Sequence, residues 1–434
     1  MIKIKEDDIL LERLRQDLKQ LSENFLQYLN IQERYSAIGN YQSKTPINKI
    51  ADLLIEYAYE SRASDIHLEP QQNFWKIRYR IDGKLILVDE LDFKIGQYLL
   101  SYIKVISNLD IAERRLPQDG KYMYRTEILN IDLRVSTIPI LYGEKLVLRL
   151  LGNIDNLLKI ENMNFSHDNL QKMKDLLGAS SGLVIITGPV NSGKSTLLYA
   201  CLDKLNNESL NIITIEDPIE LNMPDVNQMQ VNIKAGLDFS AALKASLRQD
   251  PDVVMIGEIR DEVVAKQAIR AALTGHLVLS TVHASTVWEI PARLIDLGVS
   301  PVLLSVALWG MIAQRLVRRL CPHCKRQYSA QNNTIDSLVL GKSFVEGMTL
   351  YKSEGCASCN GTGFLGRVAL QEVLISDHQI KSSINEINTK KVFSKLLEHK
   401  DFISLLEDGK TKILQGLTTS DEVLRALSGV YDFE

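Results

Sequence analysis

The chain has 434 residues, of which 45% are hydrophobic and 24% are charged, close to the average for globular proteins. This length exceeds one ordinary core, so we expect two or more domains, and the composition disfavours disorder, a collagen repeat and a disulfide scaffold. With 50 Lys and Arg against 54 Asp and Glu, the formal net charge is -4, so any contact with nucleic acid or an anionic membrane must be local.

Residues 9 to 29 carry apolar side chains at alternating three- and four-residue spacings, which indicates one apolar face of a helix. The positions are Leu11, Leu14, Leu18, Leu21, Phe25 and Leu29. Two interpretations stay open: the face packs on the protein's own core, or it docks on a partner. Residues 30 to 45 are polar, so we expect an amphipathic helix and a linker over 1–45.

The sequence also bears on location. The first residues, MIKIKEDDIL, place acids where a signal peptide needs its apolar region. The longest uncharged apolar stretch, residues 298–314, falls short of the roughly 18 residues of a spanning helix. We therefore expect a soluble cytoplasmic protein.

Residues 46–151 have the pattern of a separate α+β domain. A helical stretch, INKIADLLIEYAYESRA, precedes the alternating runs FWKIRYRI and KLILVDEL, which indicate strands. Asp82 and Gly83 join these two runs, and this dipeptide readily adopts the positive φ of a hairpin turn. A second predicted pair, YMYRTEIL and IDLRVSTIPI, meets at Asn130.

Residues 152–320 alternate helical segments with short apolar runs. The runs are LVIIT, NIITIE, VVMIG and HLVLST. They are nearly continuous in apolar character, as strands buried on both faces of a parallel sheet must be. We therefore predict an α/β domain with helices on both faces of the sheet.

The segment GPVNSGKS, Gly188 to Ser195, fits the phosphate-loop pattern G-x-x-x-x-G-K-[ST]. It follows the run LVIIT and precedes the helical sequence STLLYACLDKL, which is the strand–loop–helix context of the motif. In this context backbone N–H groups surround phosphates, Lys194 neutralises their charge and Ser195 binds Mg²⁺. The predicted ATP-binding residues are Gly188, Pro189, Val190, Asn191, Ser192, Gly193, Lys194, Ser195 and Thr196.

Two acids are expected beside this loop, because carboxyl ends of neighbouring buried strands meet there. Glu216 follows the run NIITI, and Glu258 follows VVMIG at the position of a Mg²⁺-arranging acid. A surface acid at a strand end is the alternative for each. His276 and His283 flank the run LVLST, and the residues alone leave open whether they contact phosphate or are ordinary polar groups.

Four of the five cysteines form two Cys-x-x-Cys pairs, Cys321 with Cys324 and Cys356 with Cys359. Two such pairs can bind a tetrahedral ion through thiolates at about 2.3 Å, so we predict a structural Zn²⁺ site in an insert at 321–372. A redox dithiol and unliganded thiols are the alternatives. Cys201 stands apart, and we expect it to be buried packing.

The C-terminal region, 373–434, has the pattern of small helices. The last one is expected to begin at Thr419, with Glu422 completing a capping box. A basic cluster beside the first cysteine pair is either a solvated face or a contact for an acidic partner or membrane surface. It comprises Arg315, Arg318, Arg319, Lys325 and Arg326.

These segments together resemble the secretion ATPase superfamily, and within it the ATPases of type II secretion and type IV pilus assembly. The matching blocks are ASDIHLEP, RYRIDG, RLPQDG, GPVNSGKSTLLY, TIEDPIE, LRQDPDVVMIGEIRD, TGHLVLSTVHAST, AQRLVRRLCPHCK and GCASCNGTGFLGR. They lie in the family's order between about Ile47 and Leu427. The resemblance implies an α/β, RecA-like P-loop ATPase core after an α+β domain, with a Cys₄ zinc insert and a small C-terminal helical region.

The resemblance also implies roles for single residues. Glu216 matches a water-positioning base, Glu258 the Walker-B acid near Mg²⁺, and His283 a histidine linked to the γ-phosphate. Arg134 and Arg149 match arginines that reach the nucleotide when the N-terminal domain closes, and such an arginine can contribute ~10³ to 10⁵ in rate. Retraction ATPases lack the cysteine insert, so its presence favours assembly or secretion.

The implied partners are those of a motor at the bacterial inner membrane. We expect a homo-hexamer that acts on an inner-membrane platform protein, with another inner-membrane assembly protein as a further candidate, and peripheral membrane association through these partners. Fewer than 50 residues precede the mixed domain, so we expect the helix at 9–29 to replace the docking domain of many relatives. Val190 and Asn191 stand where the family commonly has Thr-Gly, and Asn tolerates the left-handed geometry of that position.

We therefore predict a cytoplasmic, Mg²⁺-dependent ATPase that powers assembly of a type IV pilus or a type II pseudopilus. A nucleic-acid-translocating motor uses the same phosphate loop. The -4 charge and the absence of interleaved aromatic and basic segments disfavour it, and we expect no direct nucleic-acid contact. A non-hydrolysing, ATP-gated scaffold is the second alternative.

Overall fold

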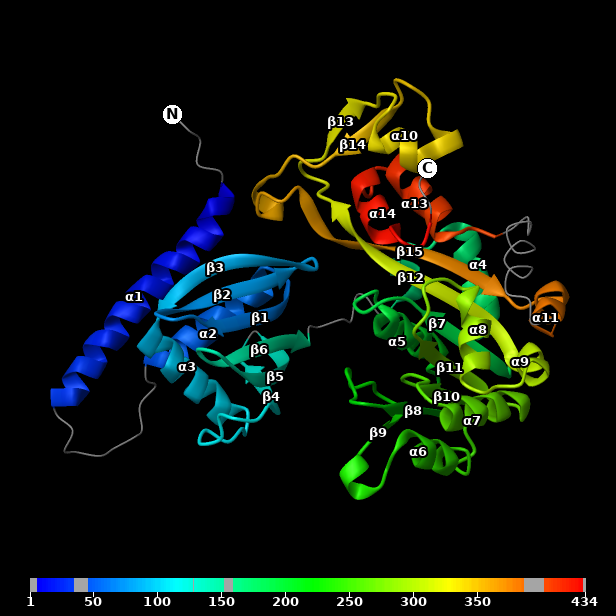
Figure 1. The fold of residues 1–434 in the computed structure, drawn as a ribbon, viewed down its shortest axis with the longest axis horizontal. Coiled ribbons are helices and arrows are strands. Elements are labelled where there is room, and N and C mark those ends of the chain that lie inside the picture. The colour runs from blue at the N-terminus through cyan, green and yellow to red at the C-terminus, as the bar shows by residue number, and fades with distance from the viewer. Residues whose placement is uncertain (1–5, 35–45, 128, 152–158, 386–401, 432–434) are drawn as a thin grey trace. The chain divides into compact units, whose positions relative to one another are not determined.

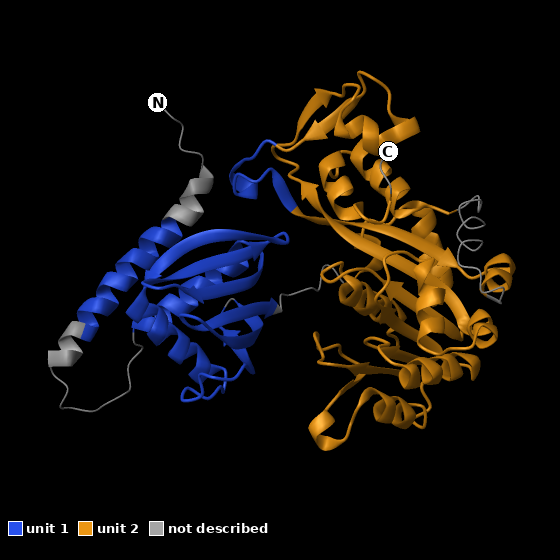
Figure 2. Cartoon of the chain, viewed as in Figure 1, with its two compact units in different colours: residues 1–153, 354–365 blue, residues 154–353, 366–434 orange. Residues whose placement is uncertain are grey.

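The computed structural model describes residues 6–34, 46–127, 129–151, 159–385 and 402–431. The chain forms two compact units, 1–153 with 354–365 and 154–353 with 366–434 (Figure 2). The finer division into 1–45, 46–151, 152–320, 321–372 and 373–434 stays a prediction.

The first unit contains one mixed sheet-and-helix core. Its elements are α1 (Glu6–Arg34), α2 (Pro46–Glu60), β1 (Ala63–Pro70), β2 (Phe74–Ile81), β3 (Lys84–Asp92), α3 (Phe93–Ile106), β4 (Gln118–Arg125), β5 (Asn130–Ile140) and β6 (Gly143–Leu151). The strands form an antiparallel six-stranded sheet in the order β3-β2-β1-β6-β5-β4 (Figure 1). Asp82 and Gly83 have φ of 47° and 85° between β2 and β3, which confirms the predicted hairpin turn.

Alternation along the strands gives this sheet two different faces. Ile66, Ile77 and Leu133 are buried in the core that the sheet shares with α2 and α3. The other face carries charged side chains, because Arg134 pairs in register with Arg149, which in turn pairs with Asp65. Cross-strand partners project to the same side, so both predicted arginines belong to this charged face.

Helix α1 packs on its own unit. Leu14, Leu18 and Phe25 are 1%, 1% and 3% exposed and join the core formed with α2 and α3. The Phe25 ring meets the Tyr98 ring edge-on, with the centroids 5.4 Å apart. This packing supports the first of the two interpretations of the amphipathic pattern; the Leu11 side chain lies outside the described side chains.

The second unit contains a seven-stranded sheet between two layers of helices. Its sheet strands are β7 (Gly182–Thr187), β8 (Ile212–Glu216), β9 (Asn227–Gln230), β10 (Val253–Ile256), β11 (Leu277–Val282), β12 (Leu308–Leu320) and β15 (Phe364–Ile375). Its helices are α4 (His167–Leu177), α5 (Lys194–Leu205), α6 (Phe239–Ser246), α7 (Glu262–Leu273), α8 (Glu289–Asp296), α9 (Pro301–Ala307), α11 (His378–Asn385), α13 (Leu405–Leu414) and α14 (Ser420–Leu427). Short 3₁₀ turns cover Ile160–Asn162 and Ile233–Ala235.

The strand order is β15-β12-β7-β11-β10-β8-β9, and β7, β8, β10 and β11 are fully buried and parallel (Figure 1). Alternate residues of β7 face opposite layers: Val184 and Ile186 pack with α4 and α5, whereas Leu183 and Ile185 pack with α6 to α9. This arrangement confirms the predicted α/β fold with helices on both faces of the sheet.

A small subdomain follows β12. It has an antiparallel pair, β13 (Arg326–Ser329) and β14 (Thr349–Lys352), with α10 (Ile335–Leu340) and a 3₁₀ turn at Gly341–Ser343. In the second cysteine pair, Cys359 ends a 3₁₀ turn, Ala357–Cys359, and Cys356 is the N-cap residue of this turn. Residues 364–372, which the sequence analysis places in the insert, form part of β15 in the seven-stranded sheet.

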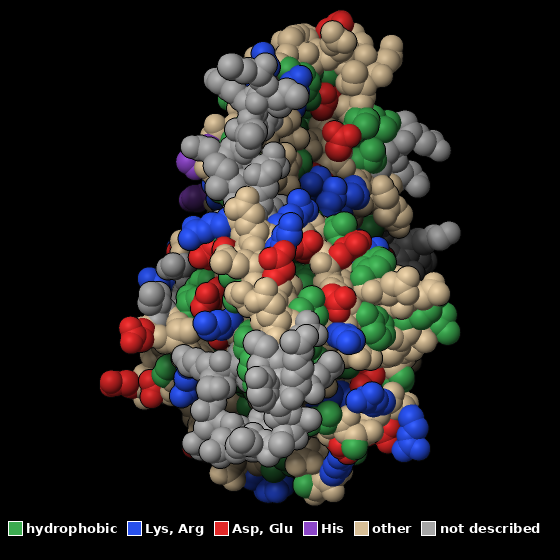
Figure 3. Space-filling view, turned by 90° about the vertical axis from the view of Figure 1, so that its left-hand side faces the viewer, with side chains coloured by type: hydrophobic (Ala, Val, Ile, Leu, Met, Phe, Trp, Pro, Cys, Tyr) green, Lys and Arg blue, Asp and Glu red, His purple; other side chains and the backbone are tan. Residues whose placement is uncertain are grey.

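One face of the molecule carries charged side chains of both signs (Figure 3). On the face drawn in Figure 3, Lys and Arg side chains are interspersed with Asp and Glu side chains. Among the described residues, no helix combines the length and the apolar character needed to cross a bilayer.

Candidate functional site

The predicted phosphate loop connects β7 to α5. Gly188, Asn191 and Gly193 have φ of 149°, 65° and 85°, so the loop needs three residues with positive φ. Asn191 therefore adopts the left-handed geometry expected of it. A Cβ atom at Gly193 would lie 2.7 Å from Gln314 Nε2, which donates to the Ser192 carbonyl at 2.9 Å. Gln314 thus supports the loop from β12.

Lys194 begins α5 and reaches back over the loop. Its Nζ donates to the carbonyls of Gly188 at 2.7 Å and Pro189 at 2.9 Å. Burial lowers the pKa of Lys194, while the Glu258 carboxylate opposes this shift. The ammonium group and the free N–H groups of the first turn of α5 face the same region, so a negative ligand is favoured there.

A cavity of ≈ 160 Å³ lies where β8, β10 and β11 end. Its lining includes Lys194, Ser195, Glu216, Glu258 and His283. Residues that are up to 89 positions apart in the sequence therefore surround one space. Carboxyl ends of parallel strands at such an edge are the usual location of ligand sites in α/β sheets.

Glu258 has the more accessible carboxylate of the two acids. Its side chain is 17% exposed, forms an ion pair with Arg260, and lies 3.6 Å from His283 Nε2. A hydrogen bond to this carboxylate raises the pKa of the Arg260 guanidinium. The Glu258 carboxylate oxygens can therefore bind a ligand in the cavity, while Arg260 and His283 orient the carboxylate.

Glu216 is different, because it is 4% exposed and its oxygens are already hydrogen-bonded. Tyr199 Oη donates to Oε2, while Thr214 Oγ1 at 2.6 Å and Gln228 Nε2 at 3.1 Å donate to Oε1. Sequence reasoning missed these three donors. A signal for Tyr199 existed, because it lies four residues after Ser195 and hence on the same face of α5.

The two histidines are separated by the length of β11. His283 lines the cavity. The residues on either side of His283 are both hydrogen-bonded to Thr187: its Oγ1 donates to the Val282 carbonyl at 3.0 Å and accepts from the Ala284 N–H at 2.8 Å. His276 precedes β11, and its Nδ1 contacts the Ala271 carbonyl at 3.0 Å. The structure thus brings His283, and not His276, to the acids.

Arg134 and Arg149 lie in the first unit, on its charged face. Arg149 Nε donates to Asp65 Oδ1 at 2.9 Å, and its side chain is 57% exposed. Arg80 also pairs with Asp65, at 3.6 Å. Asp65, which belongs to the block ASDIHLEP, therefore orients one of the two predicted arginines.

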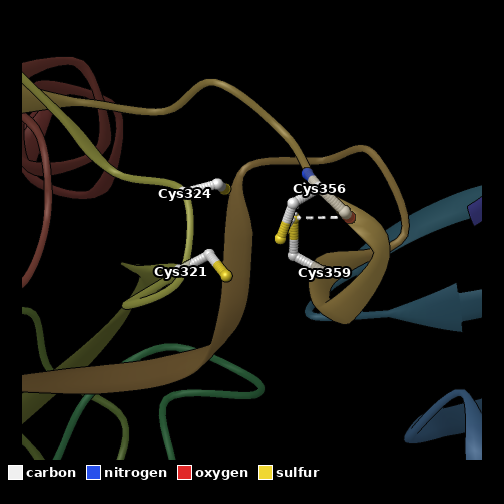
Figure 4. Close-up of side chains that lie close together, drawn as sticks. All are labelled: Cys321, Cys324, Cys356 and Cys359. Carbon is white, nitrogen blue, oxygen red and sulfur yellow. Dashed lines mark hydrogen bonds between the residues drawn. The ribbon is translucent and has the colours of Figure 1, made fainter. Parts of the chain in front are cut away.

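The four cysteine sulfurs form a candidate metal site. They lie within 4.8 Å of one another, with Cys321 and Cys359 buried (Figure 4). Two ligands at 2.3 Å from a tetrahedral ion lie about 3.8 Å apart, and the Cys356 and Cys359 sulfurs are separated by 3.8 Å. The backbone N–H groups of Cys356 and Gly363 both point at Cys359 Sγ, at 3.2 Å. The donor set fits Zn²⁺.

The basic cluster is largely engaged within its own unit. At least three members contact the C-terminal helices and their flanking turns: Arg315 donates to the Ala426 carbonyl, Arg318 pairs with Glu422, and Lys325 donates to the Gly416 carbonyl. These contacts account for most of the cluster without an external partner.

Glu372 on β15 connects the loop after His283 to the C-terminal helices. Its carboxylate accepts the N–H of Val287 at 2.8 Å and of Leu405 at 3.1 Å. The side chain is fully buried, and this burial raises its pKa to about 7, although the two N–H groups and Arg315 act in the opposite direction.

Comparison with known proteins gives consistent matches. The sequence pattern of the family described as Type II/IV secretion system protein matches residues 40–425. Type IV pilus assembly ATPase PilB of Thermus thermophilus is 43% identical over 376 residues, which are 87% of this chain and 42% of that protein. Type II secretion system protein E of Dickeya dadantii is 41% identical over 384 residues, which are 88% of this chain and 76% of that protein. The chain therefore spans less than half of the Thermus relative.

Solved structures show the same fold. The Legionella pneumophila ATPase DotB matches 91% of this chain and 98% of its own, with a TM-score of 0.65 at 21% identity. The pilus retraction motor PilT, solved with bound ADP, matches 86% of this chain and 95% of its own, with a TM-score of 0.58 at 25% identity.

Proposed function

The chain belongs to the family of type II/IV secretion system proteins, and from this premise we propose that it is a Mg²⁺-dependent ATPase that powers assembly of a type IV pilus or a type II pseudopilus. Relatives named for pilus assembly and for type II secretion are 43% and 41% identical, so they support both systems about equally. The single observation that carries the proposal is the cavity where Lys194 and Ser195 meet Glu258 and Glu216.

In this proposal each residue of the cavity has one task. Lys194 and the N–H groups at the start of α5 bind the β- and γ-phosphates of ATP. The Ser195 hydroxyl and the Glu258 carboxylate would bind Mg²⁺, which prefers such oxygen ligands and neutralises phosphate charge when bound. Glu216 accepts a hydrogen bond from the attacking water and orients it, and His283 contacts the γ-phosphate.

Arg134 and Arg149 belong to the same proposal. Their task is to donate to the phosphates when the first unit closes on an ATP site, where two guanidinium groups spread the charge of the transition state. The exposed Arg149 side chain, oriented by Asp65, is consistent with this task. The four cysteines would bind Zn²⁺ in a closed structural site, since four protein ligands leave no open position for catalysis.

The assembly we propose is a homo-hexamer in the bacterial cytoplasm. It acts at the inner membrane through a platform protein, with another inner-membrane assembly protein as a second contact, and it does not bind nucleic acid directly. The family relationship supports these statements. The formal net charge of -4 supports the proposal that the chain does not bind nucleic acid directly.

Phosphate release by the full chain with ATP and Mg²⁺ tests the activity. We expect Lys194→Ala to abolish turnover, and Glu258→Gln to bind ATP with at least about a 100-fold loss of kcat. Lys204→Ala is the matched control, because Lys204 lies on the same helix but pairs with Glu161 at 3.0 Å. Normal turnover by Lys194→Ala would contradict the phosphate-loop assignment.

The same assay separates the two alternatives. A nucleic-acid motor would show turnover that rises many-fold when single- or double-stranded DNA is added. An ATP-gated scaffold would bind ATP tightly without phosphate release, and Glu258→Gln would then leave the measured rate unchanged.

A further inference from the structure

The Tyr199 hydroxyl forms three hydrogen bonds beside the cavity. It donates to Glu216 Oε2 and accepts the backbone N–H groups of Glu220 at 3.1 Å and Leu221 at 3.2 Å. A phenolic hydroxyl has one hydrogen to donate and two lone pairs, so every bonding position of this group is used. The ring is 2% exposed, so water cannot easily replace any of these partners.

Helix α5 holds the Tyr199 side chain at a fixed distance from Ser195. Ser195 and Tyr199 are four residues apart, so they lie on one face of the helix about 6 Å apart along its axis. The residues around Tyr199, including Leu198 and Ala200, are buried in the core beneath the sheet. A group that is hydrogen-bonded to the Tyr199 hydroxyl is therefore held at a defined position relative to Ser195 and the phosphate loop.

The Glu216 carboxylate is the group that accepts the hydrogen of the Tyr199 hydroxyl. With Thr214 and Gln228 on Oε1 and Tyr199 on Oε2, three of its roughly four acceptor positions are occupied. One position on Oε2 stays available to accept a hydrogen from water. The three donors fix the orientation of the carboxylate, and therefore also the direction of its remaining acceptor position.

We propose that Tyr199 is a positioning residue, which fixes the Glu216 carboxylate and the loop at 217–221 relative to Ser195, so that Glu216 orients the water that attacks ATP. This inference rests on the proposed ATPase function, and it assigns a role in that site to a residue on α5 that follows the phosphate loop, Gly188 to Ser195.

Tyr199→Phe in the full chain removes one oxygen atom and keeps the ring. We expect kcat for phosphate release to fall about 10- to 100-fold, because a buried charged acceptor loses one of its donors, while KM for ATP changes less than about 2-fold. Tyr79→Phe is the matched control: Tyr79 is buried in the first unit, its hydroxyl donates to the Leu54 carbonyl at 2.7 Å, and kcat should not change.

A double-mutant cycle separates positioning from general loss of structure. If Tyr199 acts through Glu216, adding Tyr199→Phe to Glu216→Gln produces no further loss of kcat, whereas a merely structural effect multiplies the two losses. Thr214→Val removes a second donor to the same carboxylate and should give the same pattern, so the idea can be tested even if Tyr199→Phe does not fold.

The outcomes are distinct. A wild-type chain without ATP turnover refutes the proposed function and this inference with it. A wild-type chain that hydrolyses ATP, with Tyr199→Phe matching it in kcat or multiplying the loss of Glu216→Gln, refutes the positioning role alone.

Discussion

Replacing Leu18 by Ala tests whether α1 is part of the first unit's core. The Leu18 side chain is 1% exposed and packs with Leu14 and residues of α2 and α3. Leu→Ala changes at such sites reduce the free energy of unfolding by about 3 kcal/mol, since both burial and packing are lost. A helix whose apolar face waited for a partner would leave Leu18 exposed in the isolated protein, and the change would then alter stability by less than about 0.5 kcal/mol.

Scanning calorimetry of the full chain measures the difference. For a unit of this size, about 3 kcal/mol corresponds to a decrease of roughly 6–12 °C in the midpoint of its transition. Gln20→Ala is the control, because Gln20 lies on the exposed side of the same helix and Ala is an equally good helix former. A midpoint for Leu18→Ala no lower than that for Gln20→Ala would refute the core assignment of α1.

Two further results are expected. Cys356→Ser should release the metal and lower the unfolding temperature. In elemental analysis the control Cys201→Ala should retain one zinc per chain. A Cys356→Ser protein with full zinc content would exclude the Cys₄ site. Because the pKa of Glu372 rises from 4.5 to about 7 on folding, the unfolded chain loses this proton first as the pH rises. The contribution of Glu372 to stability is therefore fully present below pH 4.5 and falls by up to about 3 kcal/mol as the pH rises through 7. The unfolding midpoint of Glu372→Gln should decrease less than that of wild type between pH 5 and 8, and parallel curves would contradict the shift.

Several local features were predictable because they depend on a few neighbouring residues. Asp82-Gly83 specifies its turn through positive φ, and the glycines of GPVNSGKS with Asn191 specify the phosphate loop in the same way. Continuous apolar runs identified β7, β8, β10 and β11, since only strands buried on both faces have that composition. Thr419 caps α14 as expected, with its Oγ1 3.4 Å from the Glu422 N–H.

Other features depended on residues that are distant in the chain. Glu422 was expected to complete the cap of α14, but its carboxylate accepts the N–H of Arg318 at 3.0 Å and pairs with its guanidinium. A pattern of four residues could not reveal this partner. Likewise, the run at 364–372 follows the cysteines in sequence, yet its hydrogen bonds place it in the seven-stranded sheet.

The sequence by itself determined the phosphate loop, the two cysteine pairs and the class of the fold, because backbone torsion preferences and the period of burial act over short distances. Only the tertiary structure decided how the acids are used. Glu216 ends β8, and Glu258 follows the end of the neighbouring strand β10. Tyr199, Thr214 and Gln228 surround the first carboxylate, whereas Arg260 and His283 flank the second. Which donors reach a carboxylate depends on strand order and helix packing, and these are properties of the folded chain as a whole.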